Sequence, residues 1–490
     1  MFLFFLPVPM LTCYRHLVIM RKKTGLSARC FHYFLMATGG LLAFSVYFSL
    51  TATTTQSMRD VSSVFKRLAA AGKKAATRGI TLSVLEPRVS HLNRTSHKLL
   101  KIYIYNLNSI FNTDISRCVH SEDACFDYSN HGMGKLLYRH GQISIHNTNQ
   151  FSLDVILHHQ FAHSRYRTND PSEADVFYVP AYMGSMYFCH KYDNRTAESV
   201  KRLFHYLNTM PYFRQGKPHV TTLAKIEREQ IDVISAHPAW KNLTYMIIEK
   251  DDLDFRKMLG IESQRAIVVP YPSYIHFNYT KVTDDDAYAV ENVSKYNRKL
   301  FLFFAASLRR TNPFRVKLID QFVVKTELGF KEYFKSNDVP NRDQVMLITW
   351  ECLGNHYNTT IEWMFNSVFC LQPHGDSPTR KSFYDSILSG CIPVVFQFPN
   401  ENVEFPFQRA LNYNDFIVRI PVNRNGDLEE NIPIYDYLHK IPLTEISRLQ
   451  TNLIKVLHLF QYPVIGTEQN SDEKDALEMI VDEIRVTYNL

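Results

Sequence analysis

Residues 369–396, FCLQPHGDSPTRKSFYDSILSGCIPVVF, hold two apolar runs separated by a polar turn and a stretch with helical spacing. The first run predicts a short strand, and RKSFYDSILSG predicts a helix that ends at Gly390. CIPVVF predicts the next strand. Because a helix joins the two strands, they pair in parallel within one sheet. This segment therefore predicts an α/β fold, in which helices cover both faces of a parallel sheet.

Two groups of alternating strands and helices extend this pattern along the chain. The chain has 490 residues, and a prior of roughly 150 residues per domain predicts two or three domains. The first group begins with KLLKIYIYNL and covers 98–280, and the second begins with KLFLFFAAS and covers 299–435. In the second group, NPFRVKLIDQFVVKTEL predicts one helix. The polar stretch 281–298 predicts a linker, and 436–490 predicts a helical tail. We expect a cleft between two α/β domains.

Residues 31–50, FHYFLMATGGLLAFSVYFSL, contain no formally charged side chain. This run matches the length of about 20 residues that spans the hydrocarbon core of a bilayer. Cations precede it, which predicts a cytoplasmic tail at 1–30, a signal-anchor at 31–50 and a stem at 51–97. A cleaved signal peptide is the alternative, because small residues follow the run. Met20 is a second candidate start, which would leave out residues 1–19.

The predicted lumenal part carries features of the secretory pathway. Disulfides are permitted in that compartment, although spacing alone does not choose among the pairings. We expect the local pairs Cys118–Cys125 and Cys352–Cys370, with Cys391 as a free thiol in a buried strand. N-x-S/T sequons without a central proline lie at Asn93, Asn194, Asn242, Asn278, Asn292 and Asn358.

Charge and motif patterns exclude several classes of function. The net charge is +7, but many of the cations lie before residue 79, and the later sequence interleaves both signs. Without a zinc-finger or RNA-binding motif, this distribution does not predict nucleic-acid binding. No C-x-x-C pair or His/Cys cluster predicts a zinc site. The spacings of a P-loop and of a G-x-S-x-G elbow are also missing.

The polar turn in the opening segment predicts an anion site. It follows a strand, and open α/β sheets bind ligands at the carboxyl ends of their strands. Free N–H groups at the start of the helix suit a diphosphate, together with the hydroxyls of Ser377 and Thr379. Arg380 and Lys381 oppose the helix dipole there unless an anion lies in front of them. Asp385 could reach a sugar hydroxyl. The alternative is a capped core helix with solvated cations.

The complete segment closely resembles the signature of the exostosin family of glycosyltransferases, and most of all its plant branch. KIYIYNL, NQFSLDVILHH, NDPSEADVFYVPAY, VVPYPSYIH, LFFAASLRRTNP and MFNSVFCLQP resemble further family segments, so the likeness covers about 98–487. It implies a GT-B fold of two Rossmann-like domains, with the nucleotide sugar in the C-terminal one. It also implies inversion at the anomeric carbon, a Golgi location, and neither a metal nor another cofactor.

The resemblance also assigns site residues. On the donor side these are Arg309, Gly375, Asp376, Ser377, Thr379, Arg380 and Asp385. His219, in GKPHV, matches a loop where relatives carry Gly-Arg-Asp-His, although a histidine without a catalytic role fits equally well. Relatives often carry an acid soon after VPAY, whereas the first acid here is Asp193. His219 and Asp193 are therefore weak catalytic candidates, and the sequence leaves the general base open.

We therefore expect a single-pass Golgi transferase whose catalytic domain faces the lumen. Its partners would be a UDP-sugar, with UDP-galactose as the best candidate, and a wall polysaccharide such as xyloglucan. Complexes with other Golgi glycosyltransferases also fit this location. Two alternatives remain open: a transferase for pectin or xylan, and a non-catalytic Golgi partner of a related transferase.

Overall fold

The computed structural model describes most of the chain from residue 98 onward. The described residues are 98–122, 127–140, 143–189, 195–229, 231–261, 264–277, 293, 297–305, 313–321, 323–325, 331–333, 345–348, 356–399, 401–423, 427–428, 433–464 and 474–490. The predicted tail, anchor and stem at 1–97 lie outside them, as does most of the predicted linker. Within the described ranges, no helix combines the length and the apolar character needed to cross a membrane.

The first part of the fold is a six-stranded sheet in which every neighbouring pair is parallel. Its order is β4-β1-β5-β6-β7-β8. Every residue of β5, β6 and β7 is buried, as expected where helices cover both faces of a parallel sheet. The bounds are β4 Arg167–Thr168, β1 Ile102–Ile104, β5 Val176–Val179, β6 His219–Ile226, β7 Thr244–Glu249 and β8 Ala266–Val268.

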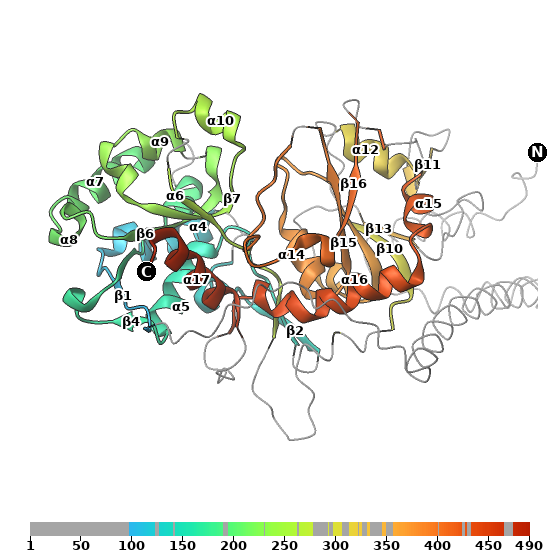
Figure 1. Cartoon of the computed structure of the whole chain (residues 1–490), viewed down its shortest axis with the longest axis horizontal. Coiled ribbons are helices and arrows are strands. Elements are labelled where there is room, and N and C mark those ends of the chain that lie inside the picture. Colours follow the sequence, from blue (N-terminus) through green and yellow to red (C-terminus); the bar gives the residue numbers. More distant parts are fainter. Residues whose placement is uncertain are drawn as a thin grey trace, which may run out of the picture. The chain divides into compact units, whose positions relative to one another are not determined.

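Helices surround this sheet, as Figure 1 shows in blue-green to yellow-green. Their apolar side chains pack with those of the strands into one core, which includes Phe177, Met183, Phe204 and Leu223. The segments NQFSLDVILHHQFAHS and AESVKRLFHYL, whose apolar residues have helical spacing, contain α5 and α7. The bounds are α4 Thr113–Glu122, α5 Leu153–His163, α6 Met183–Cys189, α7 Arg195–Leu207, α8 Pro211–Arg214, α9 Ile231–Ser235 and α10 Leu253–Met258.

The second part is a five-stranded parallel sheet with the order β13-β10-β14-β15-β16. The opening segment supplies its centre, β14–α14–β15, and Gly390 ends α14 with a φ of +69°. Gly suits this position because other residues strain there. The bounds are β10 Leu300–Ala305, β13 Val345–Ile348, β14 Ser367–Gln372, β15 Ile392–Gln397, β16 Val418–Pro421, α12 Pro313–Asp320, α13 His356–Phe365, α14 Lys381–Leu388, α15 Ile434–His439 and α16 Leu443–Val456.

One helix prediction in this part is wrong. The run NPFRVKLIDQFVVKTEL does not form a single helix, because α12 ends at Asp320. The following β11, Val323–Lys325, pairs antiparallel with β12, Lys331–Tyr333. β11 begins with two valines, whose branched side chains favour a strand over a helix.

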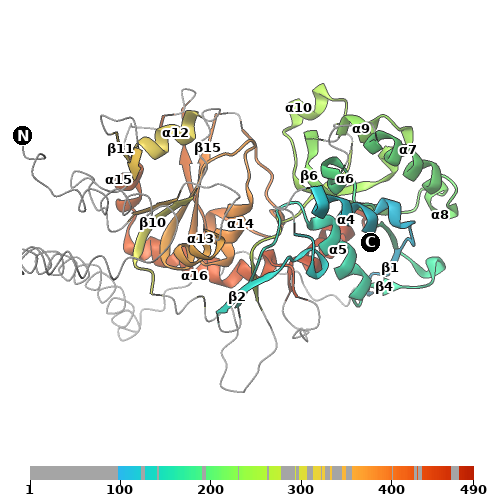
Figure 2. The same cartoon turned by 180° about the vertical axis from the view of Figure 1, so that it is seen from behind.

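Two elements join segments that are far apart in the sequence. β2 (Leu136–His140), β3 (Ile143–His146) and β9 (Ile275–Phe277) form a small antiparallel sheet that the sequence analysis did not predict. The final helix α17, Ala476–Tyr488, lies against β8, and the Tyr488 hydroxyl donates to the backbone carbonyl of His219 at 2.8 Å. Figure 2 shows the C-terminus beside the first sheet. The helical tail therefore packs on the first sheet.

The disulfides differ from the predicted local pairs. Cys118 of α4 bonds to Cys189 at the end of α6, and Cys370 of β14 bonds to Cys391 just before β15. Cys391 is thus not a free thiol. The adjacent parallel strands β14 and β15 place Cys370 opposite Pro393, which brings the two sulfurs together. Such proximity depends on strand pairing and cannot be read from local spacing. Cys125 and Cys352 lie outside the described residues.

Arg298 connects several elements of the second sheet and is buried. Its Nη1 group donates to three backbone carbonyls, those of Met364, Phe365 and Ser367, at 3.2, 3.1 and 2.8 Å. Its Nη2 group donates to the carbonyl of Ser389 at 2.7 Å, at the end of α14. One buried cation therefore satisfies the last carbonyls of two helices and the first carbonyl of β14.

Arg298→Met should lower the melting temperature by at least about 6 °C. The substitution leaves several buried carbonyls unpaired, at about 1–3 kcal/mol each, and each kcal/mol shifts the melting temperature by roughly 2–4 °C in a domain of this size. Arg202→Met is the matched control, because Arg202 is exposed on α7 and pairs with Glu198 one turn away. Equal melting temperatures for the two variants would contradict this role of Arg298.

Candidate active site

The turn at 373–380, PHGDSPTR, lies where the sequence analysis placed it, between β14 and α14. It follows the carboxyl end of a strand in the middle of the second sheet, the edge at which open α/β sheets bind ligands. The helix begins later than predicted, because Arg380 is the N-cap residue and Lys381 is the first helical residue. Pro378 biases Ser377 toward an extended backbone, which keeps Ser377 out of the helix.

A carboxylate from the first sheet holds this turn. Glu249 is the buried last residue of β7. Its Oε2 atom accepts hydrogen bonds from the Thr379 backbone N–H at 2.8 Å, from the Ser377 hydroxyl at 2.9 Å and from the Thr379 hydroxyl. Burial raises the pKa of Glu249 to about 6, although these hydrogen bonds oppose the rise. The hydroxyls predicted to bind a diphosphate therefore bind Glu249, which corrects the roles assigned to Ser377 and Thr379.

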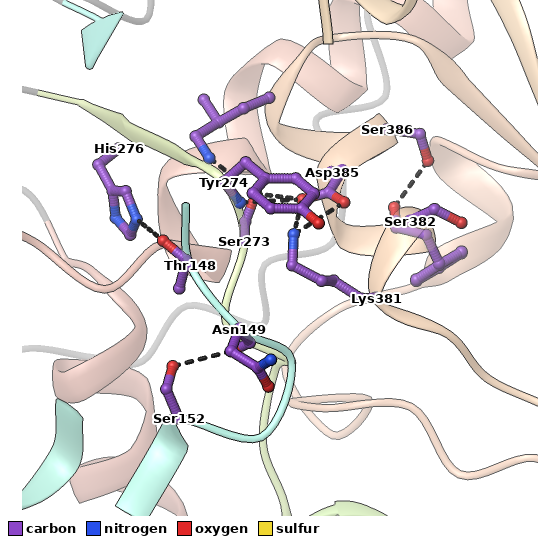
Figure 3. A network of polar contacts seen from close by, with 12 residues as sticks. Thr148, Asn149, Ser152, Ser273, Tyr274, His276, Lys381, Ser382, Asp385 and Ser386 are labelled. Carbon is purple, nitrogen blue, oxygen red and sulfur yellow. Dashed lines mark hydrogen bonds and ion pairs between the residues drawn. The ribbon is translucent and has the colours of Figure 1, made fainter. Parts of the chain in front are cut away.

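Asp385 makes a second connection of the same kind. Lys381, one turn earlier on α14, donates to both carboxylate oxygens at 3.0 and 3.1 Å. The Ser273 hydroxyl and the Tyr274 backbone N–H, from the loop between β8 and β9, donate to Oδ1 at 2.6 and 3.1 Å. Figure 3 shows Lys381 and Asp385 meeting next to the ring of Tyr274. Asp385 is buried by these partners, so the structure does not support the predicted contact with a sugar hydroxyl.

Arg380 differs from its neighbour Lys381, since its hydrogen-bond acceptors are neutral. Its guanidinium donates to the carbonyl of Ala305, at the end of β10, at 2.9 Å and to that of Pro373 at 3.4 Å. Burial lowers the pKa of Arg380 to about 9, and the nearby charge of Arg315 adds to this effect. The side chain is still protonated at neutral pH. A partly desolvated cation of this kind suits an anionic ligand.

A pocket of about 370 Å³ lies beside Arg380, at the carboxyl ends of β14 and β15. Two cations, Arg380 and Arg419, line it, together with the carboxyl group of Glu401. Phe383 and Phe405, whose ring centroids lie 5.1 Å apart, supply apolar walls. This volume falls within the usual range for small-ligand sites. Two arginines and aromatic rings suit a ligand that combines phosphate with a flat base.

His374 and Glu401 form a polar pair in the pocket lining, with 3.2 Å between Nε2 and Oε2. Burial lowers the pKa of His374 to about 4, so the imidazole is neutral at neutral pH. Burial also raises the pKa of Glu401 to about 7. The Glu401 carboxyl group can therefore donate or accept a hydrogen bond toward a ligand hydroxyl near neutral pH.

The other predicted donor-side residues have different placements. Gly375 and Asp376 lie in the 373–380 turn, where the Gly375 N–H donates to the carbonyl of Ser377 at 3.0 Å and Asp376 is exposed. Arg309 lies outside the described residues. Arg315 of α12 is a cation that the sequence analysis missed. It is buried, and it donates to the His374 carbonyl at 2.8 Å.

His219 is a core residue and not a candidate base. It is 1% exposed and is the first residue of β6. Glu249 is the last residue of the parallel strand β7, so His219 and Glu249 lie at opposite edges of the sheet. Its Nδ1 donates to the Lys217 carbonyl at 2.7 Å, so its Nε2 accepts from the Tyr105 hydroxyl at 2.9 Å. Burial lowers the pKa of His219 to about 4, which keeps it neutral. This geometry corrects one weak catalytic candidate, and the other, Asp193, lies outside the described residues.

Sequence reasoning missed Glu249, Glu401 and Arg419. Glu249 follows the apolar run YMII, and an acid at the carboxyl end of such a run was an available signal. Glu401 and Arg419 offered no comparable signal, because they meet only through the pairing of β14, β15 and β16. No group of His, Cys, Asp and Glu side chains with metal-binding geometry occurs among the described residues.

Several known proteins from Arabidopsis thaliana are similar in sequence to this chain. Xyloglucan galactosyltransferase MUR3 is 27% identical over 78% of this chain and 61% of its own length. Probable xyloglucan galactosyltransferase GT20 is 30% identical over 76% of this chain and 65% of its own length. Xyloglucan-specific galacturonosyltransferase 1 is 30% identical over 60% of this chain and 43% of its own length. The chain thus spans less than two thirds of each of these relatives.

Among solved structures, Arabidopsis thaliana UGT89C1 complexed with UDP aligns with 69% of this chain and 77% of its own. The identity is 12% and the TM-score is 0.27. The exostosin GT47 domain matches residues 96–433, which is well over half of the chain. The chain belongs to the exostosin GT47 family of glycosyltransferases.

Proposed function

We propose that this protein is an inverting GT-B glycosyltransferase that transfers a sugar from a UDP-sugar to a wall polysaccharide such as xyloglucan. UDP-galactose is the preferred donor in this proposal, because MUR3 and GT20 are named for galactosyl transfer. The observation that carries the proposal is the pocket beside the 373–380 turn, where Arg380 and Arg419 meet aromatic rings at the ligand-binding edge of a parallel sheet. A UDP-sugar combines the diphosphate and the flat base that such a lining suits.

The pocket residues would share the work of binding the donor. The guanidinium groups would neutralise the diphosphate, so this mechanism requires no bound metal. As the bond to the sugar breaks, negative charge grows on the leaving diphosphate, and a fixed cation stabilises that charge more in the transition state than in the ground state. Glu401 and His374 would contact hydroxyls of the donor. The alternative donor is a uronic acid derivative, since one relative is named a galacturonosyltransferase.

The proposed location is the Golgi membrane, with residues 31–50 as a single-pass anchor and the two sheets in the lumen. The disulfides Cys118–Cys189 and Cys370–Cys391 agree with an oxidising compartment. Asn242 is exposed at a sequon and is accessible to a glycan. Glycosidase digestion of the full-length chain from plant cells tests this location, and an unchanged mass would contradict it. Complexes with other Golgi glycosyltransferases belong to the same proposal.

The full-length chain should release UDP from one UDP-sugar in the presence of a xyloglucan acceptor, and the product should have the inverted anomeric configuration. The screen compares UDP-galactose, UDP-galacturonic acid, UDP-xylose and UDP-glucose with xyloglucan, pectin and xylan acceptors. Activity should persist in EDTA, because the arginines replace a metal. Loss of activity in EDTA that manganese restores would contradict the metal-independent site. Absence of release with every pair would instead support a non-catalytic Golgi partner.

Arg380→Ala should lower turnover at saturating donor by about 10²–10³, the usual cost of losing one preorganised electrostatic contact. Arg380→Lys should recover only part of the rate, because an ammonium cannot contact two phosphate oxygens as a planar guanidinium does. The melting temperature must be measured alongside, because Arg380 also donates to two backbone carbonyls. A stable alanine variant with near-normal turnover would place the diphosphate elsewhere.

A further inference from the structure

The first sheet presents several acids at the carboxyl ends of β6 and β7, close to the 373–380 turn. Most of them are occupied by partners. Glu227 is 2% exposed and pairs with Arg256 at 3.1 Å, and Asp251 is 7% exposed and pairs with Arg228 at 2.6 Å. Glu249 is held by the hydroxyls of the turn. These three carboxylates are therefore structural.

Glu229 differs from them in exposure. It is the last residue of the short helix η4, Glu227–Glu229, which directly follows β6, and 35% of its side chain is exposed. It also lies close to the 373–380 turn. Ile226, three residues before Glu229, pairs with Glu249 in the register of β6 and β7, and the guanidinium of Arg228, next to Glu229, lies 4.0 Å from Oε1 of Glu249, the residue that holds the turn. The solvent-accessible carboxylate of Glu229 thus lies on the side of the first sheet that meets the turn.

The position of Glu229 is fixed by an unusual cation. Lys225 of β6 is 3% exposed, and its Nζ lies 2.7 Å from Oε2 of Glu229, four residues later in the chain. Three rings surround this ammonium, with Nζ at 4.6 Å from the centroid of Phe151, 4.4 Å from that of Tyr187 and 4.5 Å from that of Phe188. Cation–π contacts of this kind hold a buried ammonium in place. An exposed carboxylate oriented by a rigid buried partner has the organisation of a catalytic base.

We propose that Glu229 is the general base of the transfer, and that Lys225 is the positioning residue that orients it. This inference rests on the proposed function. An inverting transfer needs a base within reach of the acceptor hydroxyl, on the side of the sugar opposite the leaving group. The donor pocket belongs to the second sheet, whereas Glu229 belongs to the first sheet. The two sheets therefore supply the leaving-group contacts and the base separately.

The step balances without any further reactant. The acceptor hydroxyl oxygen forms a bond to the anomeric carbon of the sugar, and its proton passes to the carboxylate of Glu229. The bond between the anomeric carbon and the phosphate oxygen breaks, and its electron pair leaves with UDP beside Arg380. The proton on Glu229 then returns to solvent, to which its side chain is partly exposed.

Glu229→Gln in the full-length chain tests this assignment. Turnover with the acceptor and donor that serve the wild type should fall by about 10²–10⁴, the usual contribution of general base catalysis. The affinity for UDP and the melting temperature should stay close to those of the wild type, because Glu229 does not line the pocket and the amide oxygen of glutamine can still accept from Lys225. Glu229→Asp should retain part of the rate, and Lys225→Met should lower turnover more than UDP affinity.

Asp252→Asn is the matched control. Asp252 is another exposed acid at this edge, and it caps α10 by accepting from the Phe255 N–H at 2.8 Å, which asparagine can also do. Its turnover should stay near that of the wild type. Azide adds a further test, because an anionic nucleophile needs no base. With azide in place of the acceptor, Glu229→Gln should form the glycosyl azide at the wild-type rate.

Three outcomes would overturn the assignment. Turnover of Glu229→Gln above a tenth of the wild-type value would show that the base lies elsewhere. If Glu229→Gln lost turnover and UDP affinity equally, Glu229 would have a structural role. The same conclusion would follow if the variant lost equal activity with the acceptor and with azide. A wild-type chain without any transfer would remove the proposed function itself and this inference with it, whereas an active wild type with an active Glu229→Gln removes the inference alone.

Discussion

The buried carboxylate of Glu249 is the interaction on which the rest of the site depends. It ends a strand of the first sheet and accepts three hydrogen bonds from Ser377 and Thr379, which belong to a turn of the second sheet. Hydrogen bonds to a charged group are worth about 1.5–3 kcal/mol each, and leaving such a buried group unpaired costs more. The conformation of the 373–380 turn is therefore fixed by a residue more than a hundred positions earlier in the chain.

The other features follow from this anchoring. The turn leads directly into Arg380, whose guanidinium lines the pocket, and α14 carries the Asp385–Lys381 pair that holds the loop between β8 and β9. The same junction brings Glu229 close to the turn, because its neighbour Arg228 lies 4.0 Å from the Glu249 carboxylate. A donor pocket on one sheet and a base on the other can act on one sugar only if the two sheets keep a fixed position relative to each other. The buried hydrogen bonds of Glu249 and Asp385 fix this relative position.

The sequence predicted the parts of the fold that depend on local patterns. Apolar runs predicted β14 and β15, and Gly390 marked the end of α14. The resemblance in the 369–396 segment predicts a donor site at the 373–380 turn, and the structure has a pocket lined by Pro378, Thr379 and Arg380 there. Predictions that depended on tertiary contacts were wrong. Ser377, Thr379 and Asp385 are residue types that often bind ligands. In the structure Ser377 and Thr379 hydrogen bond to Glu249, and Asp385 accepts from Ser273. Cys391 is buried just before β15, and the pairing of β14 with β15 gives it Cys370 as a partner. Glu401 and Arg419 come together only through the order of the strands.

The affinity of the full-length chain for UDP, measured by calorimetry for the wild type and for Glu249→Gln, tests the central claim most directly. Glutamine has nearly the same shape but no charge, so its oxygen accepts weaker hydrogen bonds from the turn than the carboxylate does. If Glu249 sets the turn that places Arg380 at the pocket, the dissociation constant should rise at least about tenfold, which corresponds to about 1.4 kcal/mol. Glu249 does not line the pocket, so this loss would act through the turn. An unchanged UDP affinity in a folded Glu249→Gln variant would contradict the account.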